Sequence, residues 1–269
     1  MRMSLSPRTD LAQEAHALRS AADAPGVQCR EEDGITRLCI ETEEAARRLG
    51  LPKGNYVNLS LQPLLRREDE AFEALCAQIS GELAAMLPRE GCILAAALGN
   101  PAMTPDALGS LTADSILATR HLGALLPGFR SVCVLRCGVL GTTGLESAAL
   151  VKAAVGVSGC TAVIAVDALC AADSEKLCAA VQLSDSGIVP GSGVGNSRMA
   201  LNRDTLGVPV ISLGVPTVID AGSLGGKSGM FVTTRDIDQR LKSAAKLLGY
   251  SINMALHPGL TPADIDLLL

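Results

Sequence analysis

Four short runs of apolar residues, separated by segments with helical spacing, constrain the fold of this chain more than any other feature. The runs cover residues 92–98, 132–136, 161–166 and 208–213. Each has the length of a strand, and none alternates between apolar and polar residues as a strand with one wet face does. Strands of this kind are buried on both faces, which favours a mostly parallel sheet covered by helices. The sequence therefore predicts an α/β fold, arranged as a three-layer α/β/α sandwich.

Segments with helical periodicity connect these runs and close the chain. We expect helices at residues 68–87, 114–126, 144–155, 168–178 and 236–256. Two alternating stretches, at residues 35–41 and 56–61, predict a small antiparallel pair. The first 30 residues are polar and contain prolines, so they are interpreted as an extension with a short helix at residues 11–22.

Composition excludes two classes of partner. Aromatic residues make up only 2% of the 269, so the aromatic platforms on which nucleic-acid bases stack are missing. The net charge is −5 and both signs are mixed along the chain, so no basic stripe is available for nucleic acid or anionic lipid. No apolar run approaches the roughly 20 residues that span a bilayer. We expect a cytoplasmic protein with no direct nucleic-acid partner and no membrane contact.

The cysteines are interpreted as small core residues. There are nine, an odd number, and no two of them form a C-x-x-C pair. Several lie within the apolar runs. This usage is typical of a reducing compartment and favours neither a zinc site nor a disulfide framework.

Four aspartates follow apolar runs, where an open parallel sheet gathers its ligands and its chemistry. They are Asp106, Asp167, Asp185 and Asp220. Two carboxylates at neighbouring strand ends can share one proton, because repulsion raises one pKa and leaves the other group ionised. Such a pair could activate water against a peptide bond. Each aspartate taken alone is better explained as a helix cap or a turn residue.

A glycine-rich stretch at residues 190–196 is a candidate for binding an anion or an oxyanion through backbone N–H groups. The residues that would do so are Gly191, Ser192, Gly193 and Asn196. The stretch is neither a Walker A loop nor a strand-to-helix G-x-G-x-x-G, so it specifies no nucleotide. The chain has only three histidines, so neither a His-based metal site nor a Ser-His-Asp triad is favoured.

Together these blocks resemble the spore germination protease family. The resemblance runs from about Arg8 to His257, nearly the whole chain. The blocks are GN at 99–100, TPDALG at 104–109, TRHL at 119–122, GTTGLE at 141–146, VIAVDAL at 163–169, SDSGI at 184–188, PGSGVGN at 190–196, TLGVPV at 205–210 and GVPTVID at 214–220.

The resemblance implies an endopeptidase that degrades small acid-soluble spore proteins during germination. It also implies a fold similar to the hydrogenase maturation proteases, an atypical aspartic-type mechanism, a homo-tetramer and a location in the forespore or spore core. The family's two proposed catalytic aspartates correspond to Asp106 in TPDALG and Asp167 in VIAVDAL. No histidine matches the metal-completing position of the maturation proteases, so no metal and no other cofactor is expected. Asp185 and Asp220 remain further acidic candidates.

The N-terminal segment Thr9-Asp10-Leu11-Ala12-Gln13-Glu14 resembles the family's cleavage pattern of an acidic residue, an apolar residue, Ala, any residue and Glu. Cleavage between Asp10 and Leu11 would divide the chain into a propeptide, residues 1–10, and a single peptidase domain, residues 11–269. An ordinary frayed terminus is the alternative interpretation.

Two departures from the family pattern bear on the site. Only residues 221–229 connect the GVPTVID block to the C-terminal segment, where the family commonly has a long insertion, and Val189 stands where the family usually has His. The first departure bears on substrate range and assembly, and the second on the site itself. Two alternative functions stay open: a metal-dependent maturation endopeptidase that trims one partner protein, and an anion- or nucleotide-binding module built on the glycine loop.

Overall fold

The computed structural model describes residues 8–19, 25–123, 125–195 and 198–269. Its strands are β1 (Val27–Glu32), β2 (Ile35–Ile40), β3 (Gly54–Ser60), β4 (Ile93–Leu98), β5 (Val132–Gly138), β6 (Ala162–Ala171), β7 (Ala180–Ser184), β8 (Val210–Asp220) and β9 (Phe231–Val232). Its α-helices are α1 (Ala12–Arg19), α2 (Glu43–Leu49), α3 (Gln62–Leu65), α4 (Ala71–Met86), α5 (Leu108–Ala113), α6 (Leu140–Thr143), α7 (Ser147–Ser158), α8 (Arg203–Leu206), α9 (Ile237–Leu256) and α10 (Pro262–Leu268).

The strands form one mixed sheet in the order β1-β2-β3-β7-β8-β6-β4-β5, with β9 paired to β8. The pairs β8–β6, β6–β4 and β4–β5 are parallel, as the continuous apolar runs predict. The remaining pairs are antiparallel. The predicted antiparallel pair is therefore not separate, because β3 pairs with β7 and joins the parallel strands.

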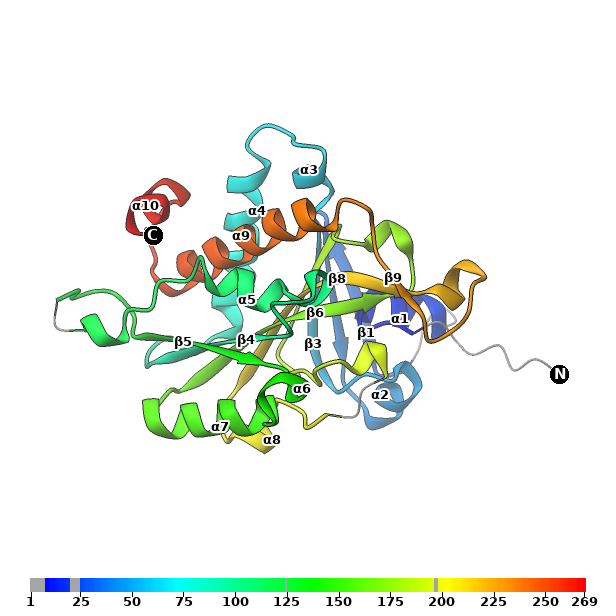
Figure 1. The fold of residues 1–269 in the computed structure, drawn as a ribbon, viewed down its shortest axis with the longest axis horizontal. Helices are drawn as coiled ribbons and strands as arrows, with labels where there is room; N and C mark the ends of the chain where they lie inside the picture. Colours follow the sequence, from blue (N-terminus) through cyan, green and yellow to red (C-terminus); the bar gives the residue numbers. More distant parts are fainter. Residues whose placement is uncertain (1–7, 20–24, 124, 196–197) are drawn as a thin grey trace.

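Helices cover both faces of the parallel strands (Figure 1), which confirms the α/β sandwich. The alternation of side chains along β4 explains why. Ile93 and Ala95 belong to the core that includes α4 and α9, whereas Leu94, Ala96 and Leu98 belong to the core under α7 and α8. A strand that buries both faces must be apolar at every position, which is the pattern read in the sequence.

Two of the expected helices are wrong. Residues 114–126 contain turns and the short 3-10 segment Arg120–Leu122, and the helix of this region is the earlier α5. Residues 168–171 continue β6, because β8 pairs with β6 as far as Ile219. Local apolar spacing favours a helix at residues 168–178, but the long neighbouring strand supplies hydrogen-bond partners that the sequence pattern does not reveal.

Several elements escape the sequence pattern, among them β1, α2 and β7. β1 and β2 form a hairpin around Asp33 and Gly34, both of which have positive φ, and α2 lies between β2 and β3. β7 is too short and too close to other apolar segments to stand out.

Among the described residues, no helix is both long enough and apolar enough to cross a membrane.

Candidate active site

Asp106 lies in the loop that follows β4, on the short 3-10 segment Thr104–Asp106. The backbone N–H of Asn100 donates to its Oδ2 at 2.8 Å. The loop returns so closely that a Cβ on Gly99 would lie 2.0 Å from the carbonyl oxygen of Asp106, and Gly99 has a φ of +92°. Only glycine fits there. Burial raises the pKa of Asp106, and the Asn100 N–H opposes that shift.

Asp167 lies within β6, next to Gly214 of β8 in the register. Its side chain is buried, and its Oδ1 accepts a hydrogen bond from the N–H of Ala168 at 3.0 Å. Burial raises the pKa of Asp167 well above its usual range, and the negative charge of Asp106 raises it further. The sequence predicted Asp167 at a strand end. It lies in mid-strand instead, because β6 extends to Ala171.

The structure brings these two aspartates to one cavity of about 620 Å³. Both carboxyl groups line it together with Asp10. Because both pKa values are raised and the groups repel each other, the pair is suited to hold one proton and one negative charge. One carboxylate that can accept a proton and one carboxyl group that can donate one are the requirements for general acid–base hydrolysis.

Asp10 reaches this cavity from the N-terminal segment. Beyond Val166, β4 no longer pairs with β6, so the edge of β6 is open. Asp10 occupies that edge: its N–H donates to the Cys170 carbonyl oxygen at 2.9 Å, and its Oδ2 accepts from the Cys170 N–H at 2.9 Å. The charge of Asp10 also raises the pKa of Asp167, so the two carboxyl groups are close enough to repel. Burial raises the pKa of Asp10 itself.

Gln182 of β7 holds the backbone on both sides of the Asp10–Leu11 bond. Its Nε2 donates to the carbonyl oxygen of Asp10 at 2.9 Å, and its Oε1 accepts from the N–H of Ala12 at 2.7 Å. Gln182 and Asp167 lie on opposite sides of Gly214 in the sheet, and both line a second cavity of about 480 Å³. Sequence reasoning missed Gln182, whose only signal is a polar residue within the apolar run of β7.

The residues after Asp10 fill three distinct environments. Leu11 is buried in a cluster with Leu169, Ala171, Leu177 and Ile219. Ala12 is fully buried in a separate apolar cluster with residues of β2 and α2, so a larger side chain would displace packed neighbours. The carboxylate of Glu14 accepts backbone N–H groups from Ala172 at 2.7 Å and from Asp173 at 3.1 Å.

The glycine loop contacts the side chain of Asp10. Ser192 donates its Oγ–H to Asp10 Oδ1 at 2.8 Å, and a Cβ on Gly193 would lie 2.1 Å from Asp10 Oδ2. Gly191 has a φ of +70° and begins the short turn Ser192–Val194. Asn196, which the sequence also places in this loop, lies outside the described residues. The loop was expected to bind an oxyanion. What it meets here is a carboxylate, while the donor to the Asp10 carbonyl oxygen is Gln182.

Asp185 and Asp220 lie away from the pair, and neither is among the residues that line the two cavities. Asp185 follows β7, which runs antiparallel to β8, so its strand end points to the opposite edge of the sheet. It accepts the backbone and side-chain N–H groups of Asn55, both at 2.7 Å. Asp220 ends β8 and accepts the Gly222 N–H at 2.8 Å. Both carboxylates stabilise loops, which is the interpretation that competes with catalysis.

Residues 8–228 match the family model described as germination protease. The chain belongs to the germination protease family. That match includes both aspartates, the glycine loop and the N-terminal segment from Arg8 onward. Family membership makes this chain a protease associated with germination.

Individual germination proteases match over most of the chain. The protein from Caldanaerobacter subterraneus subsp. tengcongensis is 36% identical over 320 residues, covering 98% of each chain. Germination protease from Bacillus cereus is 37% identical, with 97% of this chain and 77% of the relative covered. The protein from a Geobacillus strain is 42% identical, covering 81% of this chain and 65% of the relative.

The alignment with the Caldanaerobacter protein is longer than this chain, so it contains positions at which this chain has no residue. Among solved structures, the [NiFe] hydrogenase maturation protease HycI from Thermococcus kodakarensis matches with a TM-score of 0.39 and 17% identity. That match covers 64% of this chain and 98% of HycI.

Proposed function

We propose that this germination protease family member is an aspartic-type endopeptidase in which Asp106 and Asp167 activate a water molecule. Its proposed substrates are small acid-soluble spore proteins, and it is made as a zymogen that removes residues 1–10 by its own cleavage. The observation that carries the proposal is the position of the Asp10–Leu11 bond: Asp10 lines the same cavity as Asp106 and Asp167.

The reaction needs one ionised and one protonated carboxyl group. The ionised group takes a proton from water, and the water oxygen attacks the carbonyl carbon of Asp10. The hydrogen bond from Gln182 to the carbonyl oxygen stabilises the negative charge that develops there. The protonated group then donates its proton to the nitrogen of Leu11, and the C–N bond breaks. The products are a carboxyl group at Asp10 and a free amino group at Leu11.

The surroundings of residues 10–14 support a substrate preference with the same pattern. Ser192 and the Cys170 N–H bind an acidic side chain before the cut. The apolar cluster around Leu11 accepts an apolar residue after it. Ala12 has no space for more than a methyl group, and the paired N–H groups that bind Glu14 select a carboxylate. Spore proteins with an acidic-apolar-Ala-x-Glu segment would therefore occupy the site that the N-terminal segment fills here.

The propeptide then acts as an occupant of its own active site. While residues 8–14 are bound, a second substrate cannot reach the pair by the same contacts. After cleavage, residues up to Asp10 can leave, and the new N-terminal residues 11–14 have to leave the contacts of Leu11, Ala12 and Glu14 before a substrate can occupy them. The proposal also includes a homo-tetramer in the spore core, and the tetramer is tested by the mass of the purified protein in solution.

The decisive experiment follows the full chain by intact mass. Incubation at mildly acidic pH, where repulsion among the three carboxyl groups falls, should yield a chain that begins Leu11-Ala12-Gln13. Asp167→Asn and Asp106→Asn should each slow this cleavage by at least about 100-fold, since general acid–base catalysis supplies that much or more. A synthetic peptide with the sequence of residues 7–16 should be cut at the same bond by the processed wild type only.

The same samples separate the alternatives. Cleavage that persists in both Asn variants would contradict the aspartate pair. Cleavage that stops with a chelator and returns with added metal would favour the metal-dependent maturation endopeptidase. An anion- or nucleotide-binding module would give ligand-dependent thermal stabilisation with no cleavage of chain or peptide.

A further inference from the structure

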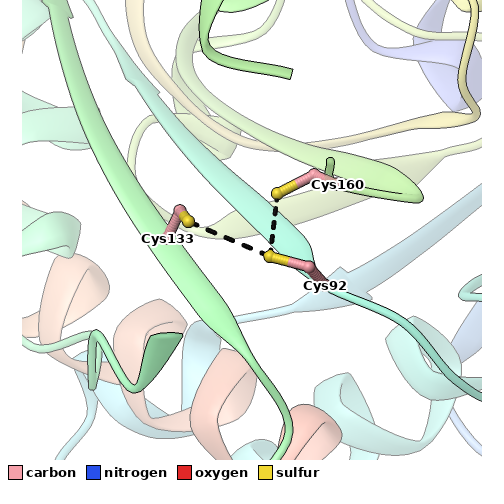
Figure 2. A group of neighbouring side chains, drawn as sticks. All are labelled: Cys92, Cys133 and Cys160. Atoms are coloured by element: carbon pink, nitrogen blue, oxygen red, sulfur yellow. Dashed lines mark hydrogen bonds between the residues drawn. The ribbon is translucent and has the colours of Figure 1, made fainter. Parts of the chain in front are cut away.

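Three cysteines at the amino ends of three neighbouring strands lie close together, on the opposite end of the strands from the aspartate pair. Cys92 immediately precedes β4, Cys133 is the second residue of β5, and Cys160 lies just before β6. β4 pairs with both β5 and β6 in parallel, so the amino ends of the three strands lie side by side. Figure 2 shows the three side chains pointing toward one another. No local spacing in the sequence indicates this cluster.

The geometry is close to that of a thiolate metal site. The Sγ atoms of Cys92 and Cys133 are 3.9 Å apart, those of Cys92 and Cys160 are 3.0 Å apart, and all three lie within 4.8 Å of one another. Three sulfur atoms at about 2.3 Å from one central ion are about 4 Å apart. One distance already matches this value, and the shorter one has to open by about 1 Å.

The surroundings supply access and compensating charge. Cys92 and Cys133 are partly exposed, whereas Cys160 is buried, so an ion could enter from solvent. The Oγ of Ser158 lies 2.6 Å from the carbonyl oxygen of Ala154 and 3.0 Å from the Sγ of Cys160, so its one proton is shared between them and the hydroxyl contacts the sulfur. Burial raises the pKa of Cys133, and the positive charge of Arg120 opposes that shift. Burial also raises the pKa of Cys160, to about 12.

We propose that Cys92, Cys133 and Cys160 bind one soft d10 metal ion, Zn(II) or Cu(I), in a structural site. Thiolates are the ligands that select these ions. Cu(I) is satisfied by the three sulfur atoms, and Zn(II) takes a solvent water as its fourth ligand. Each thiol that binds loses its proton to solvent, so affinity falls at low pH. The bound ion links the amino ends of β4, β5 and β6, and the proposed hydrolysis takes place toward the carboxyl ends of the same strands.

The test titrates the reduced full chain, in the absence of oxygen, with Zn(II) or Cu(I) against a chromogenic chelator of each ion. One equivalent per chain should bind to the wild type and to Cys39→Ser, a control in which a partly exposed strand cysteine outside the cluster is replaced. Cys92→Ser and Cys133→Ser should lose that equivalent. Comparing the two titrations identifies which ion the site prefers.

A second measurement keeps the proposal testable if a cysteine variant folds poorly. Ser158→Ala keeps all three ligands and should weaken binding by about tenfold or more, as loss of a group that orients a metal ligand does. A hundredfold excess of metal over its dissociation constant should raise the Tm of the wild type by about 5–10 °C. Equal binding by wild type and Cys92→Ser, or no binding by the reduced wild type, would overturn the proposal. The proposal would also be overturned if the chain forms a Cys92–Cys160 disulfide in air and, after reduction, binds neither ion.

Discussion

The two ends of the same parallel strands carry opposite kinds of chemistry. Toward the carboxyl ends, Asp106 and Asp167 line cavities and meet an N-terminal segment that occupies the open edge of β6. At the amino ends, Cys92, Cys133 and Cys160 pack against one another, and none of the three lines either of the two cavities. Along the chain, Cys160 precedes Asp167 by seven residues, or about 23 Å of extended chain.

The difference between these regions comes from how the strands end. The loops that leave the carboxyl ends diverge and leave space that a substrate-like chain can enter. Burial beside that space raises the pKa values of Asp106 and Asp167. The amino ends are drawn together by regular parallel pairing, so small polarisable side chains fit there. Variants in the two regions should therefore change different measurements, and the following predictions test that separation.

The largest effect is expected for Gln182→Ala. Loss of the hydrogen bond to the Asp10 carbonyl oxygen should slow self-cleavage by about 100-fold or more, the cost of removing one oxyanion donor. Gln13→Ala is the matched control, since the Gln13 amide contacts Thr36 at 3.3 Å and not the bond that is cut. Intact mass against time measures both. Equal rates for the two variants would remove Gln182 from the mechanism.

A smaller effect is expected for Glu14→Gln. The carboxylate accepts N–H groups from Ala172 and Asp173, and hydrogen bonds to a charged group are stronger than those to an amide. Self-cleavage should slow by about tenfold, the equivalent of about 1.4 kcal/mol. The same substitution in a peptide substrate should raise KM more than it lowers kcat. An unchanged KM would show that Glu14 fixes α1 and does not select substrates.

Stability should respond to pH through Asp167. The ordinary pKa of an aspartate, 3.8, applies to the unfolded chain, and the pKa of Asp167 in the folded protein is higher. Between these two pKa values the unfolded chain loses its proton first, so the free energy of unfolding falls as pH rises. An asparagine at position 167 does not ionise, so it does not carry the cost of a buried negative charge. Asp167→Asn should therefore raise the Tm at pH 7 by at least about 2–4 °C, the shift that about 1 kcal/mol produces.

This gain should shrink as the pH is lowered toward 4, where both states of the wild type become protonated. Asp106→Asn should give a smaller gain with the same sign, because Asp106 is only half-buried and its pKa is raised by burial to a lesser extent. Thermal unfolding of both variants at several pH values checks this. A wild type that is more stable than Asp167→Asn at pH 7 would contradict the raised pKa.

The smallest effect is expected for Asp185→Asn. Its carboxylate accepts hydrogen bonds from Asn55. It follows β7, which is antiparallel to β8, so it lies at the opposite end of the strands from Asp220 and lines neither cavity. Self-cleavage should stay within about twofold of the wild type, the range of changes away from a site. A loss comparable to that of Asp106→Asn would mean that strand-end aspartates act together regardless of strand direction.

The sequence by itself determines the parallel half of the sheet and its two helical layers. Residues 92–98 are apolar at every position because both faces of β4 are buried, and this requirement is local enough to read. The long helices α4 and α9 also follow from their own spacing. Asp106 and Asp167 can be singled out in the same way, since polar residues interrupt or follow apolar strands at few places.

Only the tertiary structure decides which of these residues meet. Asp185 and Asp167 look alike in sequence, but β7 runs antiparallel and carries Asp185 to the other edge, and strand direction is set by pairing between distant segments. Gln182 and the three clustered cysteines carry no local signal, because their partners are 170, 41 and 68 residues away. Hydrogen bonds and packing over such separations depend on the complete sheet, which no short stretch of sequence specifies.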